Sequence, residues 1–366
     1  MAKSTLYLKY RPFQLDDVIG QDYVTSTLKQ ASIQNRFAHA YLFGGIRGTS
    51  KTTSGRILAN LLTCSDVKNG VLCGKCPACL KIPSGNCPDF IELDGAKNGN
   101  VENVQELIES ARWSPNELKR KVYLIDECHQ LTPRAISAML KIVEEPPEYV
   151  SFIFCTTETD KIPVTILSRA QRFTFYRISV KNIATRLRFI SDKENILIDD
   201  AALYSIARLG RGSMRDAIVC LEQISTSSGQ NKIDENLVNK YYGMADRKGI
   251  FDIVKSIIEC NVSVLMDQVN DMIICSSDVK GILYEISELF RNLMVLKAQK
   301  GNTKLIDLPE HEINILINLG ASIKFNQLEK LSRAFATIEK ELDFSINKRW
   351  VLESTLLRCA AYLRQQ

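Results

Sequence analysis

The sequence contains no long apolar run. Its wholly apolar stretches stay short, as in Val122 to Ile125, and none approaches the ~18 residues that a membrane-spanning helix needs. No charged segment followed by an apolar one opens the chain, so we expect no secretory signal. We therefore expect a cytoplasmic protein with no membrane partner.

The sequence also lacks a strong charge of either sign. Its 47 Lys and Arg residues stand against 42 Asp and Glu, a formal net charge of +5. Nucleic-acid binders show clustered positive charge, so this mild surplus does not identify one. With 366 residues, 45% hydrophobic and 24% charged, the composition is that of an ordinary globular protein of two or three domains and argues against disorder.

Short apolar strands alternate with helical segments in the first half of the chain. Strands are predicted at residues 39–45, 90–93, 121–126, 151–156 and 173–176, with helices at 52–62, 101–113 and 133–143. This alternation indicates an α/β fold with a mostly parallel sheet covered by helices. From residue 180 onward the apolar positions follow helical periodicity. Glycines near residue 210 and a polar stretch at 225–232 divide this half, predicting three domains: 1–178, 179–242 and 243–366.

A glycine-rich segment lies where the first predicted strand turns into a helix, which is the context of a phosphate-binding loop. Backbone N–H groups there converge on phosphate oxygens; Lys51 would reach the β- and γ-phosphates and the Thr52 hydroxyl would hold Mg²⁺. Ser50 stands where such loops have glycine, so we expect strain of about 1 kcal/mol at this position but not loss of binding. The alternative is a turn that binds nothing. The predicted nucleotide-binding residues are Gly45, Ile46, Arg47, Gly48, Thr49, Ser50, Lys51, Thr52 and Thr53.

Two adjacent carboxylates end the predicted strand at 121–126. Parallel sheets deliver such side chains to a nucleotide at the carboxyl edge. Asp126 would order Mg²⁺, and Glu127 would polarise the attacking water. An Asp-Glu pair at a strand end is also common as a solvated edge, but its position after a phosphate loop favours the functional interpretation.

Four of the eleven cysteines crowd together with C-x8-C-x2-C-x2-C spacing: Cys64, Cys73, Cys76 and Cys79. Four thiolates with no open position are typical of a structural tetrahedral zinc site. An iron–sulfur cluster and free thiols are the alternatives, and Cys87 is a spare with less suitable spacing. The other cysteines lie mostly among apolar neighbours, where they predict buried packing in a reducing compartment. The zinc module is expected at about residues 64–87.

Together these residues resemble the gamma/tau subunit of the bacterial DNA polymerase III clamp loader, an AAA+ ATPase family. The resemblance covers about two thirds of the chain, and the final 120 or so residues match only in being helical. It rests on Tyr10–Phe13, Val18–Gln21, His39–Phe43, the phosphate loop, the four cysteines, Val122–His129, Leu140–Lys141, Glu144–Pro147, Thr156–Thr157, Pro163–Arg169 and Gly212–Ala217.

The resemblance implies roles for individual residues. Arg11 falls in the box on the adenine side of the nucleotide. Arg169 would be an arginine finger acting on ATP held by a neighbouring subunit, although Ala170 departs from the cysteine usual after it. Thr157 or Thr156 would sense the γ-phosphate, and Arg215 would contact phosphate from the helical lid.

The resemblance also implies an assembly. A motor subunit of this kind would bind and hydrolyse ATP in a hetero-pentameric ring with delta, delta-prime and further gamma/tau copies, opening the sliding clamp and placing it on primer-template DNA. Residues 179–242 would be the lid, and residues 243–366 an oligomerisation collar. Residues 96–101, with Lys97, and also Lys141, are candidates for DNA contacts without sequence specificity, made by the assembled ring. No polymerase chemistry is expected of the chain itself.

Two other functions compete with this one. The first is a scaffold subunit of the loader that binds ATP without hydrolysing it, suggested by Ser50. The second is an AAA+ branch-migration helicase, which does not account for the four cysteines.

Overall fold

The computed structural model describes residues 5–229, 231–243, 246–275, 279–303 and 305–364. The chain divides into two compact units. The first unit comprises Met1–Ile183 and Leu209–Glu222, and the second comprises Ala184–Arg208 and Gln223–Gln366. The three-domain division expected from the sequence stays a prediction.

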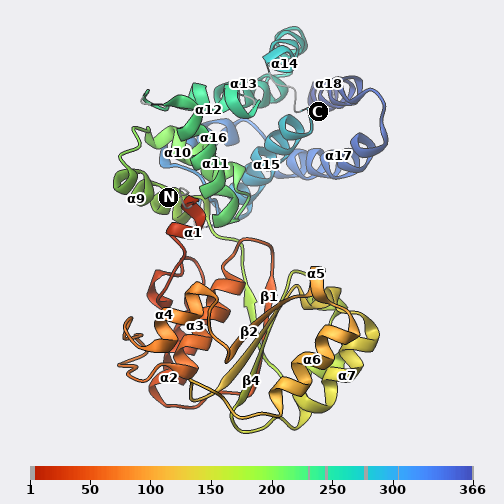
Figure 1. Ribbon diagram of the computed structural model, residues 1–366. Helices are drawn as coiled ribbons and strands as arrows, with labels where there is room; N and C mark the ends of the chain where they lie inside the picture. Colours follow the sequence, from red (N-terminus) through yellow and green to blue (C-terminus); the bar gives the residue numbers. More distant parts are fainter. Residues whose placement is uncertain (1–4, 230, 244–245, 276–278, 304, 365–366) are drawn as a thin grey trace. The chain divides into compact units, whose positions relative to one another are not determined.

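A five-stranded parallel sheet forms the centre of the first unit (Figure 1), as the sequence predicted. Its order is β2-β3-β4-β1-β5, and every neighbouring pair is parallel. Strands β1, β3 and β4 are buried along almost their whole length, which is why they read as unbroken apolar runs. The strands are β1 (Ala40–Gly45), β2 (Phe90–Asp94), β3 (Lys121–Asp126), β4 (Val150–Thr156) and β5 (Gln171–Phe175).

Helices cover both faces of this sheet. In β1, Tyr41 and Phe43 face one apolar cluster and Ala40 and Leu42 face another, as the period of two in a strand requires. The first cluster packs against α2 (Asp22–Ile33), α3 (Lys51–Thr63) and α4 (Pro77–Ser84), and the second against α6 (Val101–Ala111) and α7 (Pro133–Glu144), so these two sets lie on opposite sides of the sheet in Figure 1.

Shorter elements complete the first unit. They are α1 (Leu6–Lys9), η1 (Leu15–Asp17), α5 (Gly95–Asn98), η2 (Cys128–Gln130), η3 (Thr159–Lys161) and α8 (Val164–Leu167). Three helices, α9 (Val180–Glu194), α10 (Asp200–Leu209) and α11 (Met214–Ser228), contribute residues to both units.

In the part that the structure describes, the regular elements of the second unit are helices, with one isolated parallel bridge between Ile198 and Ile233. Its core surrounds α15 (Val279–Ala298), where Phe290 stacks on Phe335 with ring centroids 5.3 Å apart. None of the described helices is both long and apolar enough to cross a membrane. The remaining helices are α12 (Glu235–Tyr242), α13 (Arg247–Ile258), α14 (Val262–Cys275), α16 (Glu310–Ala321), α17 (Phe325–Phe344) and α18 (Lys348–Arg364).

A buried cluster of ion pairs joins four helices. Arg247 of α13 donates from Nε and Nη2 to Glu312 Oε2 of α16, at 3.1 and 2.9 Å, and from Nη1 to Glu285 of α15 at 2.9 Å. Arg208 of α10 lies 3.3 Å from the other Glu312 oxygen. Burial acts to lower the pKa of Arg247, but the carboxylates of Glu312 and Glu285 outweigh it and the pKa is raised. Each charge is therefore compensated, and loss of one would leave another buried without its partner.

Replacement of the central carboxylate should destabilise the protein strongly. Glu312 is 4% exposed, and Glu312→Gln would leave two buried guanidinium groups under-compensated, so we expect a loss of about 3 kcal/mol in the free energy of unfolding in urea. The matched control is Glu259→Gln, which removes one partner of an exposed pair with Lys255, both side chains being 56% exposed; it should cost at most about 0.5 kcal/mol. Equal losses in the two variants would show that the buried cluster contributes no more than a surface pair.

Candidate functional site

The phosphate loop connects β1 to α3, in the strand-to-helix context that the sequence predicted. Three of its residues have positive φ: Gly45 at 150°, Gly48 at 76° and Ser50 at 75°. A Cβ on Gly48 would lie 1.8 Å from Ser213 Oγ, so only glycine fits there. Ser50 occupies the N-cap position of α3 in the left-handed conformation and makes no side-chain capping hydrogen bond. This conformation costs a non-glycine residue about 1 kcal/mol or more.

Lys51, the first residue of α3, folds back over this loop. Its Nζ donates to the carbonyl oxygens of Gly45 and Ile46, both at 2.8 Å. The residue is only 5% exposed. Burial lowers the pKa of Lys51, while Glu127 acts to raise it. The ammonium is thus held among neutral carbonyl groups, where anionic phosphate oxygens would be stronger partners.

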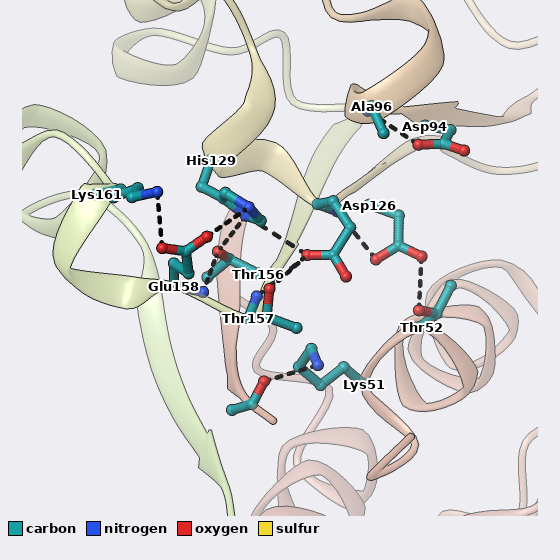
Figure 2. Close-up of polar contacts among 12 residues, drawn as sticks. Lys51, Thr52, Asp94, Ala96, Asp126, His129, Thr156, Thr157, Glu158 and Lys161 are labelled. Atoms are coloured by element: carbon teal, nitrogen blue, oxygen red, sulfur yellow. Dashed lines mark hydrogen bonds and ion pairs between the residues drawn. The ribbon is translucent and has the colours of Figure 1, made fainter. Parts of the chain in front are cut away.

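Thr52 and Asp126 meet across the site (Figure 2). The Thr52 hydroxyl donates to Asp126 Oδ2 at 2.8 Å, which connects the start of α3 to the carboxyl end of β3. Burial raises the pKa of Asp126, and the hydrogen bond from Thr52 acts against that rise. A hydroxyl and a carboxylate oxygen at this distance are the hard oxygen donors that Mg²⁺ takes in proteins, so the pair fits the metal that the sequence predicted.

Glu127 follows in a left-handed conformation, with φ of 47°. Its Oε2 accepts from both the backbone N–H and the hydroxyl of Thr157, at 3.2 and 3.0 Å. The sequence predicted Thr156 or Thr157 as the sensor of the γ-phosphate. Of these two, Thr157 is the residue that donates hydrogen bonds to Glu127. Thr156 instead lies 3.1 Å from His129 Nδ1.

Arg11 lies on the α3 side of the site and donates to the Thr53 hydroxyl at 3.3 Å. Its pKa is lowered, first by burial and then by the charge of Arg56, with Arg215 adding to the effect. Arg56 itself pairs with Glu92 of β2 at 2.7 Å. The predicted adenine-side residue is thus part of a cluster of positive charge next to the loop.

The N-terminus of α11 also reaches the loop. The backbone N–H of Met214 donates to the Gly48 carbonyl at 3.0 Å. Arg215 stacks over the ring of Tyr7, 4.8 Å from its centroid. Tyr7 was not among the sequence-predicted residues, because a lone aromatic near the start of the chain carries no signal that distinguishes it from core.

Arg169 lies apart from this group. Its guanidinium pairs with Glu144 at 2.7 Å and donates to the Thr165 carbonyl at 3.0 Å. Among the contacts of the described residues, none joins Arg169 to the phosphate loop. The arrangement suits a residue that acts on another subunit, and that role stays a prediction. So do the DNA contacts of Lys97 and Lys141, both of which are exposed.

The four clustered cysteines come together between α3 and α4. Their Sγ atoms all lie within 4.8 Å of one another, and the shorter separations run from 3.6 Å for Cys64–Cys73 to 4.0 Å for Cys73–Cys79. Zn–S bonds of about 2.3 Å in a tetrahedron put sulfur atoms about 3.8 Å apart. The geometry fits zinc, and Cys87 lies outside the group.

The thiols of this cluster differ in acidity. Burial acts to raise the pKa of Cys76, but backbone N–H donors of Cys79 and Ser65 and neighbouring thiols lower it to about 6. Burial raises the pKa of Cys79 and Cys64. A cation bound by the four sulfur atoms would favour their thiolate form.

Family models of DNA polymerase III subunits cover most of the chain. A delta subunit model matches residues 20–179, a clamp loader ATPase lid model matches 182–229, and a model of domain III of subunits gamma and tau matches 233–365. The resemblance seen in the sequence is confirmed by these matches.

Individual relatives agree with the models. The chain is 36% identical over 302 residues to DNA polymerase III subunit tau of Bacillus subtilis, covering 82% of this chain and 53% of that protein. It is 34% identical to DNA polymerase III subunit gamma of Buchnera aphidicola, covering 96% of this chain and 95% of the relative. The chain spans about half the length of the tau and tau/gamma relatives, between 52% and 56%.

Among solved structures, the RuvB Holliday junction branch migration motor of Thermotoga maritima is similar with a TM-score of 0.49 and 20% identity, over 71% of this chain and 85% of that one. The family assignment comes from the sequence relatives. With a third of its residues identical to the gamma subunit along nearly the whole of both chains, this chain belongs to the gamma/tau subunit family of DNA polymerase III.

Proposed function

We propose that this chain is an ATP-driven motor subunit of a DNA replication clamp loader, which opens a sliding clamp and places it on primer-template DNA. The observation that carries the proposal is the 2.8 Å hydrogen bond from Thr52 to Asp126. This hydrogen bond joins the phosphate loop to the carboxyl end of β3, which supports a single site where the loop would bind a nucleoside triphosphate and Asp126 and Glu127 would act on it.

ATP would bind with its phosphates on the backbone N–H groups of the loop and of the α3 N-terminus. Lys51 would exchange the carbonyls of Gly45 and Ile46 for phosphate oxygens. Thr52 and Asp126 would hold Mg²⁺, which supplies positive charge that offsets the charge of the phosphates. Arg11 would lie on the adenine side.

Hydrolysis would use Glu127. Its carboxylate would accept a proton from water as that water attacks the γ-phosphorus, the bond to the β–γ bridging oxygen would break, and ADP and phosphate would leave. Arg169 would stabilise the transition state in a neighbouring subunit, and Arg215 would report the phosphate state to the lid. Thr157, which holds Glu127 Oε2, would sense the γ-phosphate.

Partners follow from this proposal. The chain would assemble with delta, delta-prime and further gamma/tau copies into a five-subunit ring, with its collar at residues 243–366. The ring would contact the clamp and the DNA backbone without reading base sequence. The four cysteines would hold a structural zinc ion that fixes the segment between α3 and α4.

A second candidate, favoured by the left-handed Ser50, is a scaffold subunit that binds ATP without hydrolysing it. The strained loop would then hold nucleotide in a geometry unsuited to reaction. Lys51, Thr52, Asp126 and Glu127 are all in place, which favours the motor.

Replacement of Lys51 tests the proposed motor function directly. In a loader reconstituted with its partner subunits, clamp and primed DNA, Lys51→Ala should reduce ATPase activity at least about 100-fold, because the charge that stabilises the transferring phosphoryl group is removed. Lys255→Ala, at an exposed lysine of the second unit, should leave the rate unchanged. Equal rates from wild type and Lys51→Ala would exclude the motor.

Replacement of Ser50 separates the two candidates. Ser50→Gly should raise the free energy of unfolding by about 1 kcal/mol, since glycine adopts φ of 75° without strain. For a motor, the ATPase rate should change less than about threefold; for a scaffold, hydrolysis should be absent in wild type and present in the variant. Asn35→Gly, at a left-handed residue outside the site, is the control for the stability gain.

Metal analysis tests the cysteines. The purified chain should contain about one zinc per chain, and Cys76→Ser should lose the metal and the fold of the segment around it. Cys87→Ser should keep its zinc, because Cys87 lies outside the four-sulfur group. A metal-free wild-type chain of unchanged stability, or loss of zinc in Cys87→Ser, would contradict this site.

A further inference from the structure

His129 occupies a buried position beside the proposed catalytic carboxylate. It lies in η2, three residues after β3 ends, and its side chain is only 6% exposed. Two carboxylates from different segments flank the ring: Glu127 Oε2 is 3.5 Å from Nδ1, and Glu158 Oε1 is 3.2 Å from Nε2. Figure 2 shows Glu158 beside the imidazole.

The partners of the ring restrict which hydrogen bonds it can make. The Thr156 hydroxyl oxygen accepts the backbone N–H of Glu158 at 3.0 Å, so its own O–H can point to His129 Nδ1, 3.1 Å away. In a neutral ring Nδ1 then accepts this hydrogen bond, and Nε2–H donates to Glu158. Both nitrogens have partners, so the orientation of the ring is fixed.

The Glu127 carboxylate is held on one oxygen only. Its Oε2 accepts both hydrogen bonds from Thr157 and faces the His129 ring. Among the described residues, no hydrogen bond reaches Oε1, which leaves that oxygen for water. The direction of Oε1 therefore depends on the groups that fix Oε2.

We propose that His129 is a positioning residue for Glu127. Anchored by Thr156 and Glu158, the buried ring closes one side of the carboxylate and keeps Oε2 on Thr157, so that Oε1 faces the water to be activated. This inference rests on the proposed ATPase function. It deepens that function by adding a residue that does not touch the nucleotide.

Glu158, which anchors the His129 ring, is itself paired with an exposed lysine. Glu158 lies between β4 and η3, and its other oxygen pairs with Lys161 Nζ at 2.8 Å. The hydrogen bond from Lys161 lowers the pKa of Glu158, so this carboxylate stays ionised and remains an acceptor for Nε2–H. A polar chain thus runs from Lys161 through Glu158 to His129, and the His129 ring lies against Glu127 Oε2.

This arrangement of Lys161, Glu158 and His129 predicts different effects on turnover and on ATP binding. Among the described residues, no hydrogen bond or ion pair joins the His129 ring to the phosphate loop. Loss of the ring should therefore alter the orientation of Glu127 and not the affinity for ATP. A misdirected base slows the reaction, and displacements near 1 Å can cost about 100-fold. A purely structural histidine would instead lower stability and binding together.

The experiment compares variants in the reconstituted loader with clamp and primed DNA. His129→Ala should lower kcat about 10- to 100-fold, with KM for ATP and the ATP affinity of the chain within about twofold of wild type. His129→Gln should recover most of the rate, because its amide N–H can donate to Glu158. Glu158→Gln, at a half-exposed position, should lower kcat about 3- to 10-fold by weakening the anchor. His311→Ala, at an exposed histidine of the second unit, is the matched control and should behave as wild type.

The outcomes separate the inference from the function on which it rests. An unchanged kcat in His129→Ala while wild type hydrolyses ATP would overturn the inference alone. So would a parallel fall of kcat, ATP affinity and thermal stability, since that is the pattern of a structural residue. If His129→Ala does not fold, His129→Gln and Glu158→Gln decide: wild-type rates from Glu158→Gln would overturn the inference. No hydrolysis by wild type would overturn the proposed function and this inference with it.

Discussion

The hydrogen bond between Thr52 and Asp126 is the contact on which the geometry of the site depends. It can form only because parallel strands place all their carboxyl ends at one edge of the sheet. At that edge β3 ends in Asp126 and β4 ends in Thr156, while β1 leads into the loop that starts α3. Residues far apart in the chain, at 52, 126 and 157, are thereby brought to one place. The apolar character of the strands thus determines where the polar chemistry lies.

The sequence predicts the strands and the phosphate loop well, because both follow from local patterns. Buried parallel strands are unbroken apolar runs, and a glycine-rich segment between strand and helix has few other uses. The sequence does not predict which side chains become partners. Glu127 and Thr157 are 30 positions apart, and Arg247 and Glu312 are 65 apart; no periodicity joins such pairs. They depend on how helices and strands pack, so they become visible only in three dimensions.

The four clustered cysteines show what sequence spacing can predict and what it leaves open. Their spacing predicts that four sulfur atoms meet, because two-residue intervals in a tight turn leave the thiols on one side. Spacing alone leaves zinc, iron–sulfur and free thiols open. Separations near 3.6 to 4.0 Å favour a single tetrahedral ion, since the sulfur atoms lie as far apart as the edges of a tetrahedron around one zinc.

Backbone strain gives independent support for a functional site. Among the described non-glycine residues with positive φ, Ser50 and Glu127 lie on opposite sides of the Thr52–Asp126 hydrogen bond. Such a conformation costs roughly 1–3 kcal/mol and persists where surrounding contacts determine it. At Glu127 those contacts include the Thr157 hydrogen bonds and the backbone N–H of Gln130, which donates to its carbonyl at 2.9 Å. The strain at Glu127 therefore argues against the surface interpretation of the Asp-Glu pair and for a carboxylate aimed at a substrate.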